Sequence, residues 1–124
     1  MITYTPIGYV HNDFDKPVAP GLIREGESRI ILEPEFTEGL KGIEPGHQMM
    51  VVFHFHLSDG YELLQHPRHD VTRPSRGVFA LRSPRRPNPI GITTVELISV
   101  EGNVLCVRDL DAINGSPVLD LKPA

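Results

Sequence analysis

The sequence predicts an all-β fold, a small antiparallel β-barrel or sandwich with one short helical turn. Three observations favour it: short runs of β-branched and aromatic residues recur along the 124 residues, 12 prolines and 11 glycines separate these runs, and helical periodicity is weak. A parallel sheet would need strands that alternate with helices, so an antiparallel barrel or sandwich is expected. The length fits one domain that spans residues 1–124.

The expected strands follow the runs of β-forming residues. The run 48–57 (QMMVVFHFHL) ends at a Ser-Asp-Gly turn and should form a central strand. The sequence Glu-Gly-Asn at 101–103 predicts a tight hairpin between its two flanking strands. A short helical turn is expected at 34–40, where Pro stands at a tolerated first position. The other expected strands are 3–10, 28–32, 77–83, 92–100, 103–107 and one that begins at Pro117.

Composition indicates a soluble, cytoplasmic protein. No apolar run approaches the ~20 residues of a membrane span, and the N-terminus lacks the basic and apolar regions of a secretory signal. Cys106 is the single cysteine, so the chain cannot form an intrachain disulfide. Alternating with Leu and Val in a β-run, Cys106 is expected to be a core thiol rather than a nucleophile.

Basic residues are concentrated in one stretch of this acidic chain. The net charge is -4, yet six of the 12 basic residues lie between His66 and Ile92, where Asp70 is the sole acid. Phosphate binding needs such a local excess of Arg and Lys, so we interpret the stretch as an anion-binding surface. A solvated charged loop is the alternative. The six are Arg68, Arg73, Arg76, Arg82, Arg85 and Arg86.

Two segments carry candidate ligand-binding groups. In 77–91 (GVFALRSPRRPNPIG), prolines restrict the backbone and Arg82 offers a planar, charged fork for a carboxylate or phosphate. The alternative is a structural, Pro-rich crossover. In 109–122 (DLDAINGSPVLDLK), the Asn-Gly turn would present the backbone around Ala112 and Ile113, which could recognise an adenine edge. The alternative is that the acids of this segment only cap a turn.

The histidines allow a metal site as a weaker hypothesis. His54 and His56 are two residues apart on an expected strand and share a face, and His66 and His69 follow. Four imidazoles could bind zinc, but no carboxylate or cysteine completes a recognised spacing. A partly buried polar pair on the strand is favoured, and we predict no metal.

The chain resembles the TsaA-like family, which includes bacterial methyltransferases of threonylcarbamoyladenosine in tRNA. The resemblance covers nearly the whole chain, and its motifs are specific in combination. It implies a small β-barrel that binds S-adenosylmethionine, forms a homodimer and methylates the exocyclic nitrogen of a modified adenosine in tRNA. The shared motifs are Pro-Ile-Gly at 6–8, Gly-Val-Phe-Ala at 77–80, Arg-Ser at 82–83, Arg-Pro-Asn-Pro-Ile-Gly at 86–91, Asn-Gly at 114–115, Pro-Val at 117–118 and Asp-Leu-Lys-Pro at 120–123.

The resemblance also implies site residues. His56 is the candidate catalytic residue, either positioning a reactant or accepting a proton near neutral pH. The family often has Pro-Arg-Gln in its first loop and His-Gln at the end of the central strand, of which this chain keeps Pro17 and His56. The implied cofactor-binding residues are Pro17, Val18, Ala19, His56, Leu57, Arg82, Ile92, Asp111, Ala112, Ile113 and Asn114. The residues expected to contact RNA phosphates are Arg68, Arg73, Arg76, Arg85 and Arg86.

Two other functions are compatible with these residues. One is a regulatory or interaction module that binds S-adenosylmethionine without methylating tRNA, which the altered first loop favours. The other is a metal-dependent hydrolase built on the histidines.

Methyl transfer from a sulfonium is an in-line displacement, so it requires orientation and a desolvated site but no covalent nucleophile.

Overall fold

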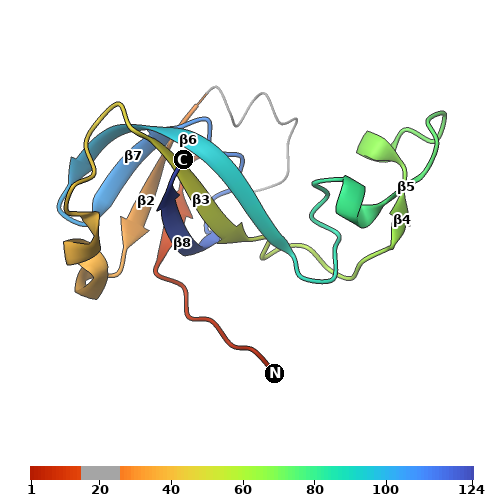
Figure 1. Ribbon diagram of the computed structural model, residues 1–124, viewed down its shortest axis with the longest axis horizontal. Helices are drawn as coiled ribbons and strands as arrows, with labels where there is room; N and C mark the ends of the chain where they lie inside the picture. Colours follow the sequence, from red (N-terminus) through yellow and green to blue (C-terminus); the bar gives the residue numbers. More distant parts are fainter. Residues whose placement is uncertain (15–25) are drawn as a thin grey trace.

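The computed structural model describes residues 1–14 and 26–124, in which six antiparallel strands close a barrel in the order β1-β2-β7-β6-β3-β8. Figure 1 shows this barrel on one side of the molecule. The predicted all-β barrel is therefore confirmed. The barrel strands are β1 (Gly8–His11), β2 (Glu27–Leu32), β3 (Gln48–His54), β6 (Ile90–Glu101), β7 (Val104–Arg108) and β8 (Pro117–Pro123).

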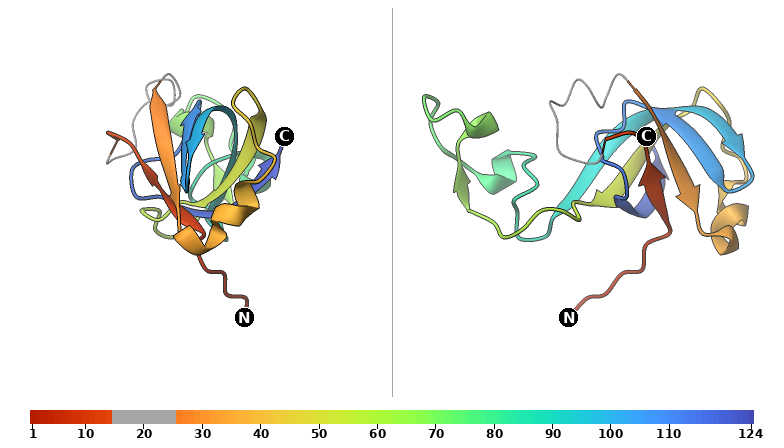
Figure 2. Two further views of the ribbon diagram at one scale, coloured as in Figure 1. Left: turned by 90° about the vertical axis from the view of Figure 1, so that its left-hand side faces the viewer. Right: turned by 180° about the vertical axis from the view of Figure 1, so that it is seen from behind.

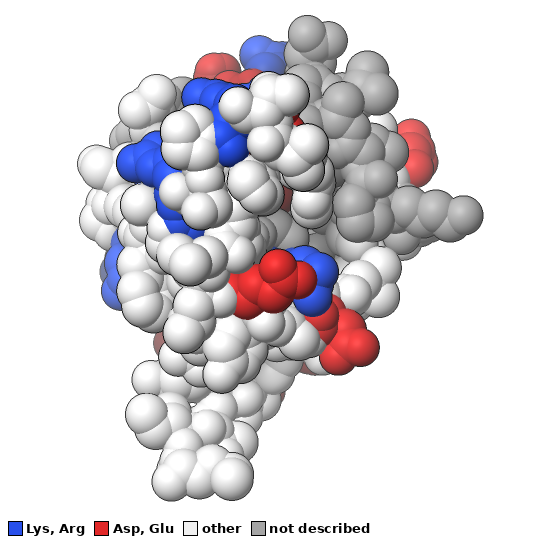
Figure 3. Space-filling view, turned by 90° about the vertical axis from the view of Figure 1, so that its right-hand side faces the viewer, with Lys and Arg blue, Asp and Glu red and all other residues white. Residues whose placement is uncertain are grey.

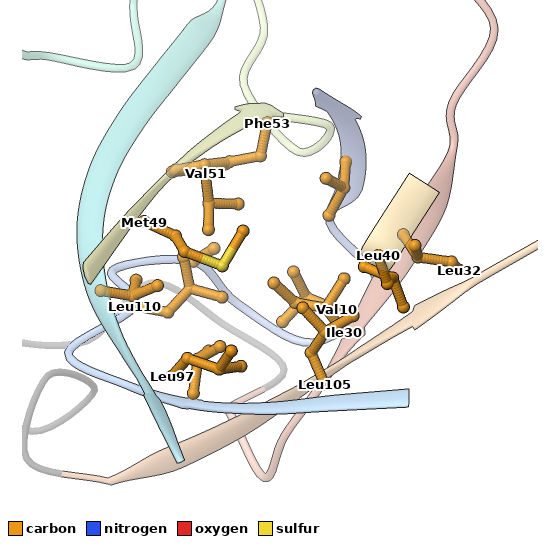
Figure 4. Packing of buried hydrophobic residues seen from close by; sticks show 14 residues of the cluster. Val10, Ile30, Leu32, Leu40, Met49, Val51, Phe53, Leu97, Leu105 and Leu110 are labelled. Carbon is orange, nitrogen blue, oxygen red and sulfur yellow. The ribbon is translucent and has the colours of Figure 1, made fainter. Parts of the chain in front are cut away.

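The core is formed by alternate residues of the strands. Successive side chains of a strand point to opposite faces, so every second apolar residue points into the barrel. Along β3, Met49, Val51 and Phe53 are buried, and Val95 and Leu97 of β6 alternate with more exposed neighbours. These side chains fill the barrel interior together with residues from the other strands (Figure 4). The interior is thus a packed core, and a ligand must bind outside it.

Barrel closure depends on a close approach at the start of β1. Gly8 pairs with Leu32 on one side and with Val118 on the other. A Cβ at Gly8 would collide with the main-chain oxygen of Ile31. Glycine is therefore required where β1 joins β2 to β8.

One long segment leaves the barrel between two paired strands. β3 and β6 pair from Gln48↔Glu96 to His54↔Ile90, and the chain between them, residues 55–89, projects away from the barrel (Figures 1 and 2). We call this segment the excursion. It contains the short strands β4 (Leu64–Gln65) and β5 (Arg76–Gly77) and the 3-10 turns η2 (Pro67–His69) and η3 (Val78–Ala80).

Several element boundaries differ from those predicted. The strand expected at 48–57 ends at His54, because its partner β6 begins opposite it at Ile90 and follows three prolines. The strand expected at 77–83 is wrong: only Gly77 pairs, after which η3 begins. This segment lies outside the barrel, where few neighbouring strands can satisfy an extended backbone.

Other predicted elements are confirmed. The expected helical turn is the 3-10 segment η1 (Pro34–Leu40), which buries Leu40 against the barrel. The hairpin turn follows Glu101, and a strand does begin at Pro117. The first strand is shorter than expected and begins at Gly8. Within the two described ranges, no helix is long and apolar enough to cross a membrane.

Candidate functional site

A cavity of about 480 Å³ lies along the first half of β6. On one side, the residues of β6 before Glu96 pair with β3. On the other side, β7 pairs with β6 only from Glu96 onward, so the first half of β6 has an unpaired edge there. The cavity lies where β6 has this open edge, and its volume is typical of a site for one small ligand. Its walls are formed by Met50, Phe53, Phe55, Leu81, Arg82, Arg86, Ile90, Gly91, Ile92, Thr93, Thr94 and Asp111.

The cavity contains groups of opposite charge. Arg82 reaches it from the excursion, and its Nη1 donates a long hydrogen bond of 3.4 Å to the main-chain oxygen of Ile92. Asp111 reaches it from the loop between β7 and β8. A guanidinium and a carboxylate in one cavity suit a ligand that carries both a carboxylate and a cationic centre.

Aromatic rings form the apolar wall. Phe53 and Phe55 pack edge to face with ring centroids 5.1 Å apart. Gly91 makes room for them, because a Cβ there would lie 2.7 Å from the tip of each ring. Phe55, which is only partly buried, can therefore contact the flat, apolar part of a ligand, with Phe53 supporting it from the core.

The loop between β7 and β8 is held by main-chain hydrogen bonds to the end of β1. Asn114 N donates to the Phe14 oxygen at 2.6 Å, and Gly115 N donates to the Val10 oxygen at 2.7 Å. Ala112 is buried in the core, only 3% exposed. The predicted turn at 111–114 is thus attached at several points to β1 and the residues after it.

His56 lies against this turn rather than on the cavity wall. A Cβ at Gly115 would lie 3.5 Å from its Nε2. Its Nδ1 is buried with no hydrogen-bond partner in the described part of the chain. Burial, and secondarily repulsion by His54, hold the pKa of His56 below its ordinary value. The imidazole is therefore neutral at neutral pH and able to accept a proton.

The structure brings together only part of the predicted cofactor set. Arg82, Ile92 and Asp111 share the cavity, with Ala112, Ile113 and Asn114 directly following Asp111 in the loop. Leu57 is 58% exposed and is not part of the cavity wall. The predicted residues Pro17, Val18 and Ala19 lie outside the described residues.

The sequence predictions omitted several residues of the cavity wall. Phe55, Thr93 and Thr94 were not among the predicted site residues, although Ile92 was. Phe55 and Thr93 stand directly beside His56 and Ile92 in the sequence, which is a usable signal. No sequence signal indicates the open edge of β6, because strand pairing cannot be read from one run of residues.

The arginines predicted to contact RNA form two groups. Arg68, Arg73 and Arg76 are exposed on the excursion, and none pairs with a carboxylate in residues 1–14 or 26–124. Arg85 pairs with Glu62 at 3.3 Å, and Arg86 Nη1 donates to the main-chain oxygens of Leu81 and Ser83. Figure 3 shows basic side chains spread over the face at the excursion's end of the molecule. We call Arg68, Arg73 and Arg76 the outer arginines.

The histidines considered for zinc are dispersed in the structure. His54 ends β3, whereas His66 and His69 lie in the excursion around η2. His66 Nδ1 is 2.8 Å from the main-chain oxygen of Arg73. Among the described residues, no three His, Cys, Asp or Glu side chains are grouped closely enough to hold a metal ion.

The fold and the cavity define a class: a closed antiparallel β-barrel with a charged, ligand-sized cavity at the open edge of one strand. A family model described as the tRNA-methyltransferase O N-terminal domain matches residues 8–124. The chain belongs to this family, the TsaA-like family, so the resemblance seen in the sequence is confirmed.

Relatives and solved structures agree with this assignment. A Pyrococcus abyssi protein named as a probable S-adenosyl-L-methionine-binding protein is 42% identical over 99% of this chain and 68% of its own length. An Archaeoglobus fulgidus protein named as an S-adenosyl-L-methionine-binding protein is 40% identical over 94% of this chain and 85% of its own. The crystal structure of TrmO from Pseudomonas aeruginosa superimposes with a TM-score of 0.77 at 31% identity. The match covers 100% of this chain, which spans 56% of that one.

Proposed function

We propose that the chain is an S-adenosylmethionine-dependent methyltransferase that methylates the exocyclic nitrogen of threonylcarbamoyladenosine in tRNA. The observation that carries the proposal is that Arg82 and Asp111 line one cavity together with aromatic residues. Membership of the tRNA-methyltransferase O family and relatives named for binding S-adenosyl-L-methionine support it.

The residues of the cavity fit this cofactor chemically. The Arg82 guanidinium can pair with the carboxylate of the cofactor's methionine part. The Asp111 carboxylate can attract the positive charge of the cofactor. The partly buried ring of Phe55, packed against the buried Phe53, offers an apolar wall for the adenosine part. The cofactor, when bound, supplies an activated methyl group on its sulfonium.

The protein's own contribution is orientation and exclusion of water. Holding donor and acceptor in line can lower the barrier by several kcal/mol without any covalent nucleophile. The nitrogen that gains a methyl group must lose a proton, and the neutral His56 is the proposed proton acceptor or positioning group. The position of His56 next to Gly115, just after the turn that follows Asp111, supports this role.

Replacing Arg82 by Ala is expected to weaken S-adenosylmethionine binding by about 1.5–3 kcal/mol, the range for a hydrogen bond to a charged group. Calorimetry with the purified protein measures this. Arg108→Ala is the matched control, because Arg108 is an exposed barrel arginine paired with Glu27 and Glu96. Equal affinity in Arg82→Ala and the wild type would remove Arg82 from the site.

Methylation of bulk tRNA by the wild type then tests the acceptor. Transfer of labelled methyl to tRNA that carries threonylcarbamoyladenosine, and not to tRNA lacking it, is the expected result. Cofactor binding without any methyl transfer would instead support a regulatory module. The names of the relatives are compatible with such a module, because they state only that these proteins bind S-adenosyl-L-methionine.

We further propose that the chain is a homodimer whose contact includes the excursion. Large apolar side chains are exposed there, with Leu64 67% and Phe79 79% accessible. Exposed apolar groups gathered in one region are typical of interaction surfaces. A two-fold contact would also duplicate the outer arginines.

The expected result for Phe79→Asp is dissociation to a monomer at concentrations where the wild type is a dimer. Light scattering over a dilution series measures the mass. Phe36→Asp is the control, since Phe36 is 38% exposed on η1, at the end of the barrel away from the excursion (Figure 1). A wild type that stays monomeric over the whole dilution series would contradict the homodimer.

A further inference from the structure

Asn12, just after β1, is hydrogen-bonded to segments that lie far apart in the sequence. Its Nδ2 donates to the main-chain oxygen of Ala112 at 2.8 Å and to Ser28 Oγ at 3.1 Å. Its Oδ1 accepts from Phe14 N at 3.0 Å, and its own N donates to Asn114 Oδ1 at 3.1 Å. One half-buried side chain thus joins the end of β1, the start of β2 and the loop between β7 and β8.

These bonds position a turn that contributes to the cavity. Ala112 directly follows Asp111, so a bond to the Ala112 oxygen fixes the backbone that carries the Asp111 carboxylate. Phe14, which Asn12 Oδ1 holds, in turn accepts from Asn114 N at 2.6 Å. The carboxyamide therefore restrains the turn 111–114 from both sides, through one carbonyl and through the Phe14 backbone.

The chemistry requires an amide at position 12. The half-buried Asn12 side chain donates to two oxygens and accepts from one N–H, and an ionised Asp can accept but cannot donate. Ser28 is itself buried, 2% exposed, so its hydroxyl has limited alternatives. A side chain that fails to donate would leave the Ala112 oxygen without this partner, and the turn could move.

We propose that Asn12 is a positioning residue for cofactor binding, which sets the turn 111–114 and the Asp111 carboxylate in the geometry that the ligand requires. The inference rests on the proposed function, because it needs the cavity to be the cofactor site. Asn12 itself is absent from the cavity wall, and so acts through Asp111 and the turn.

The test compares Asn12→Asp with Asn103→Asp. Asn103 Nδ2 also donates to a main-chain oxygen, that of Leu32 at 2.6 Å, but in the hairpin region between β6 and β7. Both variants exchange a donating amide for an isosteric carboxylate. Both are expected to lower the melting temperature, so the loss of stability does not distinguish them. Cofactor affinity is the distinguishing readout.

We expect Asn12→Asp to bind S-adenosylmethionine at least about tenfold more weakly than the wild type, measured by calorimetry well below both melting temperatures. Asn103→Asp should bind within about twofold of the wild type. Ser28→Ala, which removes only the hydroxyl that accepts from Asn12, should weaken cofactor binding a few fold. It replaces Asn12→Asp as the test variant if Asn12→Asp does not fold. Equal affinity in folded Asn12→Asp, or in Ser28→Ala where that variant serves, would overturn the inference. A wild type that does not bind the cofactor would overturn the proposed function instead.

Discussion

Replacing all three outer arginines by Ala is expected to weaken tRNA binding more than tenfold and to reduce the log-log salt slope of binding by about two to three. Each neutralised phosphate releases counterions, so the slope falls by roughly 0.7–0.9 for every phosphate that an arginine no longer neutralises. The side chains of Arg68, Arg73 and Arg76 are exposed and, within the described chain, unpaired with carboxylates, so a phosphate meets no competing ion pair. Titrations of tRNA binding at several salt concentrations measure both quantities.

The double variant Arg85→Ala/Arg86→Ala is the matched control. Arg85 is paired with Glu62, and Arg86 donates hydrogen bonds to two main-chain oxygens within the excursion. The double variant is therefore expected to have lower thermal stability, with a change below about one in the salt slope of tRNA binding. S-adenosylmethionine affinity should be unchanged in the triple variant, because no outer arginine lines the cavity. An unaltered salt slope in the triple variant would rule out these arginines as phosphate contacts.

Gly8→Ala is expected to lower the free energy of unfolding by about 3 kcal/mol, at the upper end of the range for overpacking. The added Cβ meets the Ile31 oxygen and, at 2.8 Å, the Leu32 Cα, which are backbone atoms of the paired strand β2. Backbone in a closed barrel cannot shift as a side chain can, so the strands must separate. Denaturant unfolding monitored by circular dichroism measures the change.

Gly39→Ala provides the control for Gly8→Ala. Nothing lies within 4 Å of a Cβ at Gly39, which is in the exposed part of η1. Alanine there should be neutral or slightly stabilising, because it reduces the freedom of the unfolded chain. A loss below about 1 kcal/mol in Gly8→Ala would show that β1 and β2 can adapt after all.

The barrel could be predicted because its strands satisfy local rules. The run that became β6 alternates buried and exposed residues over most of its length, and the turn between β6 and β7 has the residues that such turns prefer. In these segments propensity, alternation and turn chemistry agree with the tertiary structure. Sequence reasoning alone was therefore sufficient for the fold class and most strands.

The excursion could not be predicted in the same way. The run 77–83 has β-forming residues, yet outside the barrel its backbone finds few partners, and Val78 N bonds to the Leu63 oxygen as η3 begins. Phe79, apolar by type, is largely exposed. Residue type indicates preference, whereas the neighbours decide whether a strand forms.

The candidate site could be predicted only in part, because some of its contacts join residues that are far apart in the sequence. Arg82 was expected from its charge and Asp111 from the family resemblance, and the structure places both in one cavity. The pairing of Arg85 with Glu62 depends on distances across the excursion that no local pattern contains. Asn12 had a weak signal, since Asn often accepts from the N–H two residues on, but its bond to Ala112 spans 100 positions.

The place where the excursion joins the barrel has a consequence for how such chains can diversify. It leaves after His54 and returns at Ile90, and these two residues are paired opposite each other, as at the base of a hairpin. Lengthening or shortening the outer part would leave the register of β3 and β6 intact, at an entropic cost of only about 0.6 kcal/mol per doubling of loop length. Its returning arm carries Leu81, Arg82 and Arg86 on the cavity wall, whereas the outer arginines lie beyond that arm. Insertions and deletions between the two would therefore reposition the outer arginines and leave the cavity wall and the barrel register unchanged.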